Sequence, residues 1–273
     1  MARLERPDGV GLHWEERGEG PLVVLAPWWS GHPGVYEGLL SDLAHDHRVV
    51  TWDARGTGES TPTGPYDMET DCSDLEAILE KAGGEAVVIC TADGANRGVR
   101  VAASREDLVA AVVALGTAPF ARTHFEGGEG MIASDTVVGA FMDMVERDYR
   151  GALRTLLAAT NTQMSEAQLR ERVGFQVSYC PPEPAAARVR AWAQDDPTAA
   201  ARDTGERLWI LAAPDVAGPW LPPVQERRRL TETLVPKAHI EEVEPETGPI
   251  TQPGIAAAVI RRISAPLRLE SSR

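Results

Sequence analysis

The chain of 273 residues lacks the features that define several large classes of protein. No apolar run approaches the roughly 20 residues that a membrane-spanning helix needs, and the stretch from Met1 to Pro7 contains no apolar segment typical of a secretory signal. The three cysteines, Cys72, Cys90 and Cys180, are widely spaced and form no C-x-x-C pair, which argues against a disulfide framework or a zinc site. We therefore predict a cytoplasmic protein in a reducing compartment, without membrane contact.

An excess of positive charge is also missing. The formal net charge is −14, from 41 acidic residues against 27 lysines and arginines. Nucleic acids and anionic membranes attract basic surfaces, so this balance argues against both as partners and against a polyanionic substrate. Neither a G-x-G-x-x-G fingerprint nor a Walker loop occurs, and we expect no cofactor and no bound metal. The expected partner is a small-molecule substrate, and a homo-oligomer is left open.

What the sequence does contain is an alternation of strand and helix patterns. Apolar residues make up 43% of the chain and charged residues 25%, which is ordinary for a globular protein. Short apolar runs alternate with stretches of helical spacing, which predicts an α/β fold with a mostly parallel sheet and helices on both faces. The runs lie at 22–26, 48–52, 86–89, 111–115, 208–212 and 240–243, and the helical stretches at 35–44, 68–79, after 94 and at 255–263.

The two ends of the chain carry further predictions. A strand at 10–14, a glycine-rich turn at 18–20 and the strand at 22–26 predict a hairpin that opens the sheet. At the other end, the polar tail after Ala265 is expected to be frayed.

Only helical patterns occur in the stretch 121–204, and they lie at Val137–Val145, Ala152–Ala159, Glu166–Val173 and Ala185–Ala193. Because this stretch separates two sheet-forming parts, we predict a helical cap at 121–204 inserted into a core formed by 1–120 and 205–273. Such a cap would lie over the carboxyl edge of the sheet, where α/β proteins bind their ligands.

Two motifs connect the chain to a known family. Residues Asp53 to Ser60 read D-x-R-G-x-G-x-S, and the segment from Ala86 to Asn96 leads from an apolar strand through a small-residue turn into a helix, as a nucleophile elbow does. Together with the position of the insert, these motifs resemble the α/β-hydrolase family with a helical cap. The resemblance covers residues 8–120 and 205–265, and it implies catalytic residues in the order nucleophile, acid, histidine.

The elbow contains no serine. The five residues that match G-x-S-x-G are Cys90-Thr91-Ala92-Asp93-Gly94, with Ala92 at the nucleophile position. A shift by one residue would instead put Asp93 there and Ala95 at the second glycine. We favour Ala92, because that register keeps Gly94 where the backbone must approach closely.

The histidine that the resemblance implies is missing as well. Asp215 follows the strand at 208–212 and matches the acid, but Pro249 stands where the histidine should follow the last strand. Proline has no titratable group, and His239 lies at the opposite end of that strand. The backbone N–H of Trp29 could still supply half of an oxyanion hole. A serine-hydrolase mechanism is not expected, since a nucleophile without a base stays protonated.

Asp93 is the main catalytic candidate. As a nucleophile it would resemble the aspartate of dehalogenases and epoxide hydrolases of this superfamily, and buried beneath the cap it could act as a general acid or base. The competing interpretation is a helix N-cap whose carboxylate accepts backbone N–H groups. His32 and Asp215 are the candidate partners in catalysis, the alternatives being an exposed histidine and a structural aspartate.

Six residues are candidates for contact with the substrate: Trp28, Trp29, Ala92, Asn96, Arg97 and His124. The two tryptophans suit a flat or apolar ligand, unless one of them belongs to the core. Arg97 would pair with a ligand carboxylate or with Asp93, or would lie on the solvated side of its helix or bond another loop. His124 would reach from the cap into the pocket.

Three functions are compatible with these residues. The first is an enzyme of secondary metabolism that acts on a small, largely apolar, aromatic or polyketide-like molecule by acid–base chemistry such as cyclisation, elimination or isomerisation. The second is a hydrolase that uses Asp93 as nucleophile on an epoxide, halide or ester. The third is a catalytically inactive pseudo-hydrolase that binds a ligand or a partner.

Overall fold

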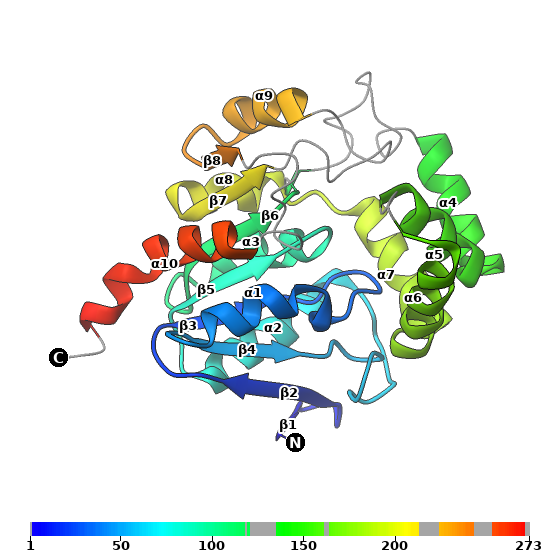
Figure 1. Ribbon diagram of the computed structural model, residues 1–273, viewed down its shortest axis with the longest axis horizontal. Coiled ribbons are helices and arrows are strands. Elements are labelled where there is room, and N and C mark those ends of the chain that lie inside the picture. The colour runs from blue at the N-terminus through cyan, green and yellow to red at the C-terminus, as the bar shows by residue number, and fades with distance from the viewer. Residues whose placement is uncertain are drawn as a thin grey trace.

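The computed structural model describes residues 2–117, 119–120, 135–160, 164–212, 224–242 and 253–270. These residues form one eight-stranded sheet in the order β1-β2-β4-β3-β5-β6-β7-β8, with helices on both of its faces (Figure 1). The strands are β1 (Ala2–Glu5), β2 (Gly11–Arg17), β3 (Leu22–Leu25), β4 (Arg48–Trp52), β5 (Ala86–Cys90), β6 (Val109–Leu115), β7 (Leu208–Ala212) and β8 (His239–Glu242). The helices are η1 (Pro33–Tyr36), α1 (Glu37–Leu43), α2 (Met68–Ala82), α3 (Gly94–Ser104), α4 (Asp135–Arg147), α5 (Tyr149–Thr160), α6 (Glu166–Tyr179), α7 (Pro182–Gln194), α8 (Thr198–Thr204), η4 (Gly205–Arg207), α9 (Val224–Leu234) and α10 (Pro253–Glu270).

The predicted hairpin between β2 and β3 is wrong. β4 lies between these two strands and pairs antiparallel with β2 and parallel with β3. Both strands thus use the hydrogen-bonding edges that a hairpin would have joined. β2 forms its hairpin with β1 instead, in a register that places Leu4 opposite Leu12. Most residues of β1 are exposed, so no apolar alternation marks this strand in the sequence.

The parallel strands divide their side chains between two apolar layers. In β3, Val24 packs with α2 and α3 on one face, whereas Val23 and Leu25 pack with α1 and α10 on the other. Each such valine or leucine contributes about 1.5–3 kcal/mol when it leaves water. Since β5 and β6 follow the same alternation, the continuous apolar runs of the sequence are explained by burial on both faces.

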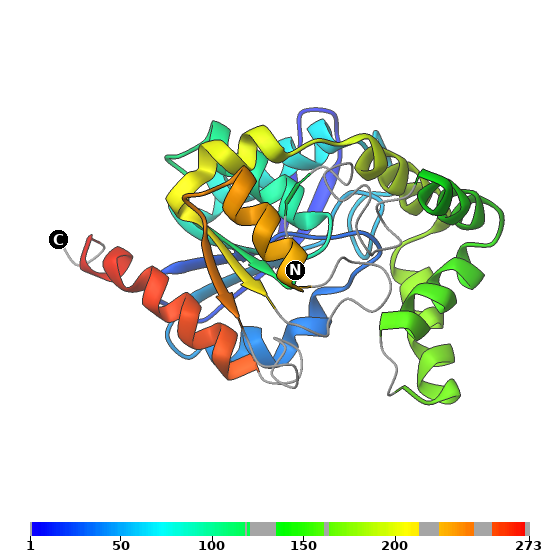
Figure 2. The same cartoon turned by 90° about the horizontal axis from the view of Figure 1, so that it is seen from above.

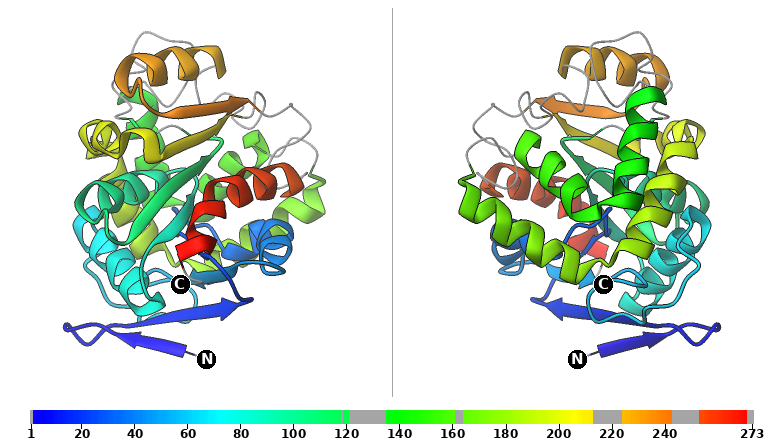
Figure 3. Two further views of the ribbon diagram at one scale, coloured as in Figure 1. Left: turned by 90° about the vertical axis from the view of Figure 1, so that its left-hand side faces the viewer. Right: turned by 90° about the vertical axis from the view of Figure 1, so that its right-hand side faces the viewer.

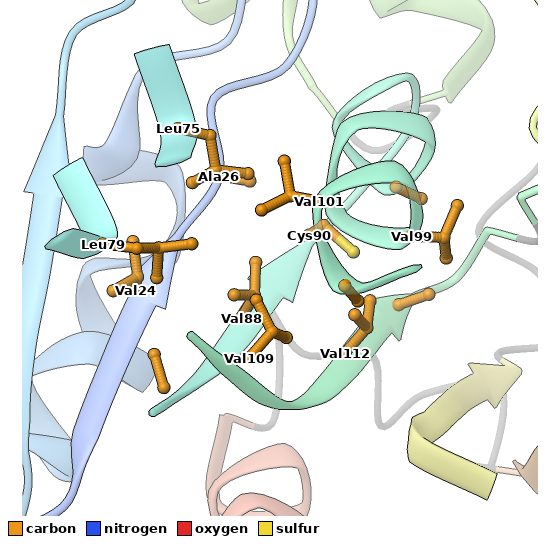
Figure 4. Close-up of a cluster of buried hydrophobic side chains, with 14 of the residues drawn as sticks. Val24, Ala26, Leu75, Leu79, Val88, Cys90, Val99, Val101, Val109 and Val112 are labelled. Atoms are coloured by element: carbon orange, nitrogen blue, oxygen red, sulfur yellow. The ribbon is translucent and has the colours of Figure 1, made fainter. Parts of the chain in front are cut away.

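α3 packs closely on the sheet at the point where β5 ends (Figure 4). A Cβ atom added to Gly98 would lie 3.3 Å from the Sγ atom of Cys90 and 3.3 Å from a methyl carbon of Val112. Cys90 itself is fully buried, as expected for a small packing residue. The helix that follows the elbow is therefore held in a fixed position relative to the strand before it.

Helices α4 to α7 form the predicted insert beyond the carboxyl ends of the parallel strands (Figures 1 and 2). They have an apolar cluster of their own, in which Leu153 and Val173 are buried. α8 differs, because its Ala201 belongs to a core cluster and the hydroxyl of Thr204 donates to the Val99 carbonyl of α3. The division into core and cap at residues 121 and 204 stays a prediction.

The C-terminal helix is longer than predicted. α10 runs to Glu270 rather than fraying after Ala265, because Leu267 still packs against the cluster that contains α1. Arg261 of the same helix donates to Asp42 of α1, and the two helices lie side by side (Figure 3). None of the described helices is long and apolar enough to cross a membrane.

Candidate functional site

The strained residue of the elbow is Ala92. It has a φ of 45° between the end of β5 and the start of α3, a left-handed conformation that costs a residue with a side chain about 1–2 kcal/mol. A sharp, strained turn from strand to helix is the geometry of the nucleophile position in such an elbow. A Cβ atom at Gly94 would lie 2.8 Å from the Pro27 carbonyl oxygen, so the second glycine is required. Both observations favour the register with Ala92 at the nucleophile position.

Asp93 is buried and holds two partners, neither of which is an orphan N–H group of α3. Its Oδ1 atom accepts the backbone N–H of Trp29 at 2.6 Å, and its Oδ2 atom lies 2.7 Å from Nη2 of Arg97. The residue occupies the N-cap position, but its side chain makes no capping bond and its backbone is helical. The helix-cap interpretation is therefore wrong. Of the alternatives for Arg97, the structure contains two, the pairing with Asp93 and a hydrogen bond to another loop, at Pro27.

The Trp29 N–H was expected to point inward as half of an oxyanion hole. It lies in the loop between β3 and η1, at the expected position, but it donates to the Asp93 carboxylate. A negatively charged side chain thus takes up the donor that would stabilise a developing oxyanion. This donor is not free in the structure.

Arg97 and Arg188 share a carboxylate beneath the elbow. Arg97 Nε and Arg188 Nε both donate to Oδ2 of Asp71, at 3.0 and 2.9 Å, and Arg188 Nη2 donates to Oδ1 at 2.9 Å. Arg97 also donates to the Pro27 carbonyl, which rules out the solvated side of the helix that was one alternative for it. These contacts join α2, α3 and α7, and so fasten the cap to the core.

The charges of this cluster balance: two guanidinium groups face the carboxylates of Asp71 and Asp93. Burial alone would raise the pKa of Asp71, but Arg188 and Arg97 beside it lower that pKa from 3.8 to about 2. Burial lowers the pKa of Arg97, and the neighbouring carboxylates of Asp93 and Asp71 raise it. The net result is a pKa above the ordinary value of arginine. Asp71 and the two arginines that pair with it are therefore charged near neutral pH.

A small cavity adjoins this cluster, at the junction of the core loops and the cap. It has room for about one water molecule. Its lining consists of Pro27, Trp28, Ser30, Gly31, Ala54, Thr57, Arg97 and Arg188. The Nη1 atom of Arg188 is buried and has no hydrogen-bond partner. The cavity therefore offers one free donor.

The two tryptophans have different surroundings. Trp28 packs edge-on against Tyr36 and adjoins the core cluster of α1 and α10, while it also lines the cavity. Trp29 points into the cap, where its Nε1 donates to the Ala185 carbonyl at 2.8 Å and its ring contacts Phe141. Trp28 thus combines the two roles that were considered for it, and Trp29 joins the core to the cap.

His32 and Asn96 do not contact Asp93. The Nδ1 atom of His32 accepts the N–H of Gly34 and so caps η1, and its ring lies edge-on to Phe175. The amide of Asn96 donates to Asp195, in the segment after α7. Among the residues that the structure describes, no second acid–base group contacts Asp93 except Arg97.

Three residues of the sequence analysis, His124, Asp215 and Pro249, lie outside the described residues. His239 is the first residue of β8 and stacks on Trp209, with ring centroids 4.0 Å apart, so it lies far from the carboxyl edge of the sheet. Of the five histidines that the structure describes, only His32 follows a parallel strand directly. The described residues contain no group of three or more His, Cys, Asp or Glu that could hold a metal ion.

Sequence reasoning missed the part of Asp71 and Arg188 in this site. Asp71 lies in the first turn of α2, and Asp71, Asp74, Leu75 and Ile78 follow helical spacing and are all buried. Acidic residues on the apolar face of a helix are a signal of buried ion pairs. Arg188 lies among alanines in α7, and its pairing depends on a contact 117 residues away in the chain, for which the sequence contains no signal.

A profile of the α/β hydrolase fold matches residues 21–219. The chain therefore belongs to the α/β-hydrolase fold family. It is 27% identical over 181 residues to a pimeloyl-(acyl-carrier protein) methyl ester esterase of Nitrosomonas europaea, an alignment that covers 64% of this chain and 69% of the esterase. It is also 29% identical over 117 residues to a 2-(acetamidomethylene)succinate hydrolase of Mesorhizobium japonicum, which covers 42% of each chain.

Solved structures have the same fold at low sequence identity. A hydrolase from Oleispira antarctica superimposes with a TM-score of 0.77 at 16% identity, covering 92% of this chain and 93% of that one. The structure of an E-2-(acetamidomethylene)succinate hydrolase gives a TM-score of 0.71 at 20% identity, with 96% and 97% coverage. The predicted fold class is thus confirmed, and the relatives named above are an esterase and hydrolases.

Proposed function

We propose that this protein binds a small, largely apolar molecule between its core and its cap, and that it does not hydrolyse that molecule through a catalytic triad. One observation carries the proposal: Ala92 has the elbow backbone, and the carboxylate of the next residue accepts the Trp29 N–H. A methyl group cannot attack a carbonyl carbon. The donor that would stabilise the resulting oxyanion already serves Asp93.

The residues at the expected place of the catalytic base support the same proposal. The sequence places Pro249 where the family's histidine would stand. His32, the described histidine closest to the elbow in the fold, uses Nδ1 to cap η1 and contacts Phe175 and Tyr179 instead of Asp93. The chain shares ancestry with esterases and hydrolases, but a serine-type mechanism needs a nucleophile and a base that these residues do not provide.

In the proposed reaction Asp93 is the group that exchanges protons with the ligand. Its carboxylate would remove a proton from a carbon or oxygen atom of the ligand and return it elsewhere in an isomerisation or cyclisation, or keep it while a leaving group departs in an elimination. Arg97, whose Nη2 atom lies 2.7 Å from Oδ2, would hold the carboxylate in place between turnovers. His32 and Asp215 remain the candidate second groups.

A second candidate function, ligand binding without catalysis, is favoured by the partners of Asp93. Oδ1 accepts the Trp29 N–H, and Oδ2 forms an ion pair with Arg97 although it accepts no hydrogen bond. These contacts compete with a ligand for the carboxylate. For the aspartate nucleophile, in contrast, the register is unfavourable, since Asp93 follows the strained residue rather than occupying it.

Hydrolysis is tested with 1-naphthyl acetate, an apolar aromatic ester, and with a fluorophosphonate probe that labels active serines. We expect 1-naphthyl acetate to raise the melting temperature without release of 1-naphthol, and no label on the protein. The Ala92→Ser variant should remain inactive, because a hydroxyl without a base is a poor nucleophile. Release of 1-naphthol by the wild-type protein well above the rate in buffer would overturn the proposal.

Proton abstraction is tested with 2-tetralone, an aromatic ketone with exchangeable α-protons, in D₂O. If Asp93 is a base, the wild-type protein should accelerate deuterium uptake and Asp93→Asn should abolish the acceleration. The control is Asp195→Asn, which removes a carboxylate that contacts the same helix through Asn96 and Arg100. If the wild-type protein binds 2-tetralone but exchange stays at the rate in buffer, ligand binding without catalysis is the better description.

A further inference from the structure

Arg172 of α6 differs from every other arginine that the structure describes as buried or partly buried. Its side chain is partly buried, and its Nε atom is fully covered and has no hydrogen-bond acceptor. The others each donate to a carboxylate or to a backbone carbonyl. No ion pair or hydrogen bond of Arg172 occurs in the described part of the chain, so its charge has no internal counterion.

This isolation is unfavourable for folding. A guanidinium group that leaves water without an acceptor or a counterion loses hydration that nothing replaces. Burial accordingly lowers the pKa of Arg172. The chain has 41 acidic residues, yet none of the described carboxylates contacts this side chain. An external anion that binds the Arg172 guanidinium would supply the missing counterion, and this would explain why a cation occupies that position.

The surroundings of Arg172 also define the shape of a ligand. Phe175, less than one turn later in α6, is 44% exposed, which is unusual for a ring of this size. His32 lies edge-on to Phe175 at 4.9 Å and to Tyr179 at 4.8 Å, and the latter two rings are nearly parallel. An exposed aromatic ring beside a cation offers a stacking surface next to a carboxylate partner.

His32 supplies a second donor at this place. Because its Nδ1 atom accepts the Gly34 N–H, the neutral ring carries its proton on Nε2, for which no acceptor occurs among the described residues. Burial lowers the pKa of His32, Asp53 acts in the opposite direction, and Arg172 lowers the pKa further. Geometry brings the two donors to the same ring, because His32 lies against Phe175 at 4.9 Å and Phe175 follows Arg172 by three residues in α6. The imidazole is favoured in its neutral, donating form.

We infer that Arg172, His32 and Phe175 form a binding site for a small aromatic carboxylate, with the carboxylate at Arg172 and His32 and the flat body against Phe175. A monoanion matches the single unpaired guanidinium, whereas a polyanion would meet the repulsion of a chain with a net charge of −14. The site lies where α6 contacts the loop after β3. From α6, Gln176 donates to the Ser30 carbonyl of that loop and Tyr179 donates to the Asp53 carboxylate of the core. It does not depend on any role of Asp93.

The probe for this site is benzoate, compared with benzamide, its uncharged analogue of the same shape. The readout is the set of arginine Nε–H signals of the ¹⁵N-labelled protein, in which the signal lost in Arg172→Gln identifies Arg172. Benzoate should shift that signal to saturation, and benzamide should bind about tenfold more weakly or worse, since a charge-assisted pair is lost. Equal binding of benzoate and benzamide would overturn the inference.

Two matched variants locate the site. Arg172→Gln should weaken benzoate binding about tenfold or more, whereas Arg170→Gln, which changes an exposed arginine of the same helix, should leave it within about twofold. Equal losses in both variants would mean nonspecific attraction and would contradict a site at Arg172. Phe175→Ala should weaken benzoate but not acetate, and no difference between the two acids would remove the aromatic part of the inference.

The failure of this inference is distinguishable from failure of the proposed function. Asp93→Asn should leave benzoate binding within about twofold, because the binding site contains none of the elbow residues. Exchange of 2-tetralone protons, in turn, should not require Arg172. A protein that binds benzoate but neither binds nor exchanges 2-tetralone would retain the Arg172 site and lose the proposed function.

Discussion

Two groups of arginines in this protein differ in how their charge is compensated. Arg97 and Arg188 lie almost entirely out of water, and both are paired with Asp71, Arg97 also with Asp93. Arg172 is only partly buried, and it has no partner among the described residues. The charges of the first group are complete without a ligand, although Nη1 of Arg188 keeps a free donor, and its ion pairs hold helices together. The second is incomplete, and this difference separates a structural cluster from a candidate binding site.

The elbow belongs with Arg97 and Arg188, whose charges are compensated. The Asp93 carboxylate beside the elbow contacts Trp29 on one side and Arg97 on the other, so internal contacts occupy the place of the nucleophile elbow. The strain at Ala92 persists although its methyl group has no reactive atom. Such strain costs stability and persists only where the surrounding structure imposes it.

The largest effect is expected from Asp71→Asn. Loss of this carboxylate leaves Arg188 without an anionic partner and Arg97 with Asp93 alone, and breaking a buried pair costs about 3–5 kcal/mol. Urea unfolding measures the loss. Glu69→Gln, an exposed change in the first turn of the same helix, should stay within about 0.5 kcal/mol. Similar small effects of both variants would mean that the cluster does not fasten the cap.

Acid should weaken the same cluster. The pKa of Asp71 in the folded protein is about 2, against 3.8 for the free group, so its contribution is complete above about pH 4 and disappears as the pH falls from 3.8 towards 2. The loss is on the order of 2 kcal/mol. The gap in unfolding free energy between wild type and Asp71→Asn should therefore shrink across this range. A gap that is constant from about pH 5 to pH 2.5 would contradict the assignment.

Ala92→Gly is expected to increase the free energy of unfolding, by less than Asp71→Asn lowers it. Glycine adopts the left-handed conformation of the elbow without the steric cost of alanine, so the variant should be about 1 kcal/mol more stable, a rise of about 2–4 °C in melting temperature. Ala95→Gly, in the first turn of α3, is the control of opposite sign, because glycine in a helical conformation loses more conformational freedom than alanine, at a cost of about 0.5–1 kcal/mol. Destabilisation by both changes would argue against strain at Ala92.

The smallest effect concerns Arg172. Removal of an unpaired, partly buried charge should leave the free energy of unfolding unchanged or raise it by up to about 1 kcal/mol. Arg172→Gln should thus be at least as stable as Arg170→Gln in the absence of ligand. Added benzoate should stabilise the wild-type protein and not Arg172→Gln. A clear loss of stability in the unliganded variant would assign Arg172 to the complete, structural group.

Much of the fold could be predicted because it is local. Buried strands such as β5 and β6 appear as continuous apolar runs, and α2 shows helical spacing ended by glycines. The predicted β2–β3 hairpin is wrong for a nonlocal reason, because β4, a strand from later in the chain, lies between β2 and β3. Proximity in sequence favours a hairpin, but the pairing is decided by which edges are free once all strands are present.

The candidate site shows the same division at the level of single residues. The register with Ala92 at the elbow could be predicted, because a close backbone approach requires Gly94. The Trp29 partner of Asp93 could not be predicted, since a short polar residue before a helix is equally suited to capping, and the pairing with Arg97 was one of several alternatives. Only the fold brings the Trp29 N–H, 64 residues away, to its carboxylate and leaves the cap bond unmade.

The sequence by itself determined the α/β architecture, the helical insert and the alanine at the nucleophile position, because each depends on residues close together in the chain. The tertiary structure alone decided how the charges are compensated. It paired Asp71 of α2 with arginines of α3 and α7, brought the Trp29 N–H to the Asp93 carboxylate, and left Arg172 without a partner among the described residues. The physical reason is that a counterion must lie within a few ångströms, and such contacts between distant segments form only when the helices and loops that carry them pack together.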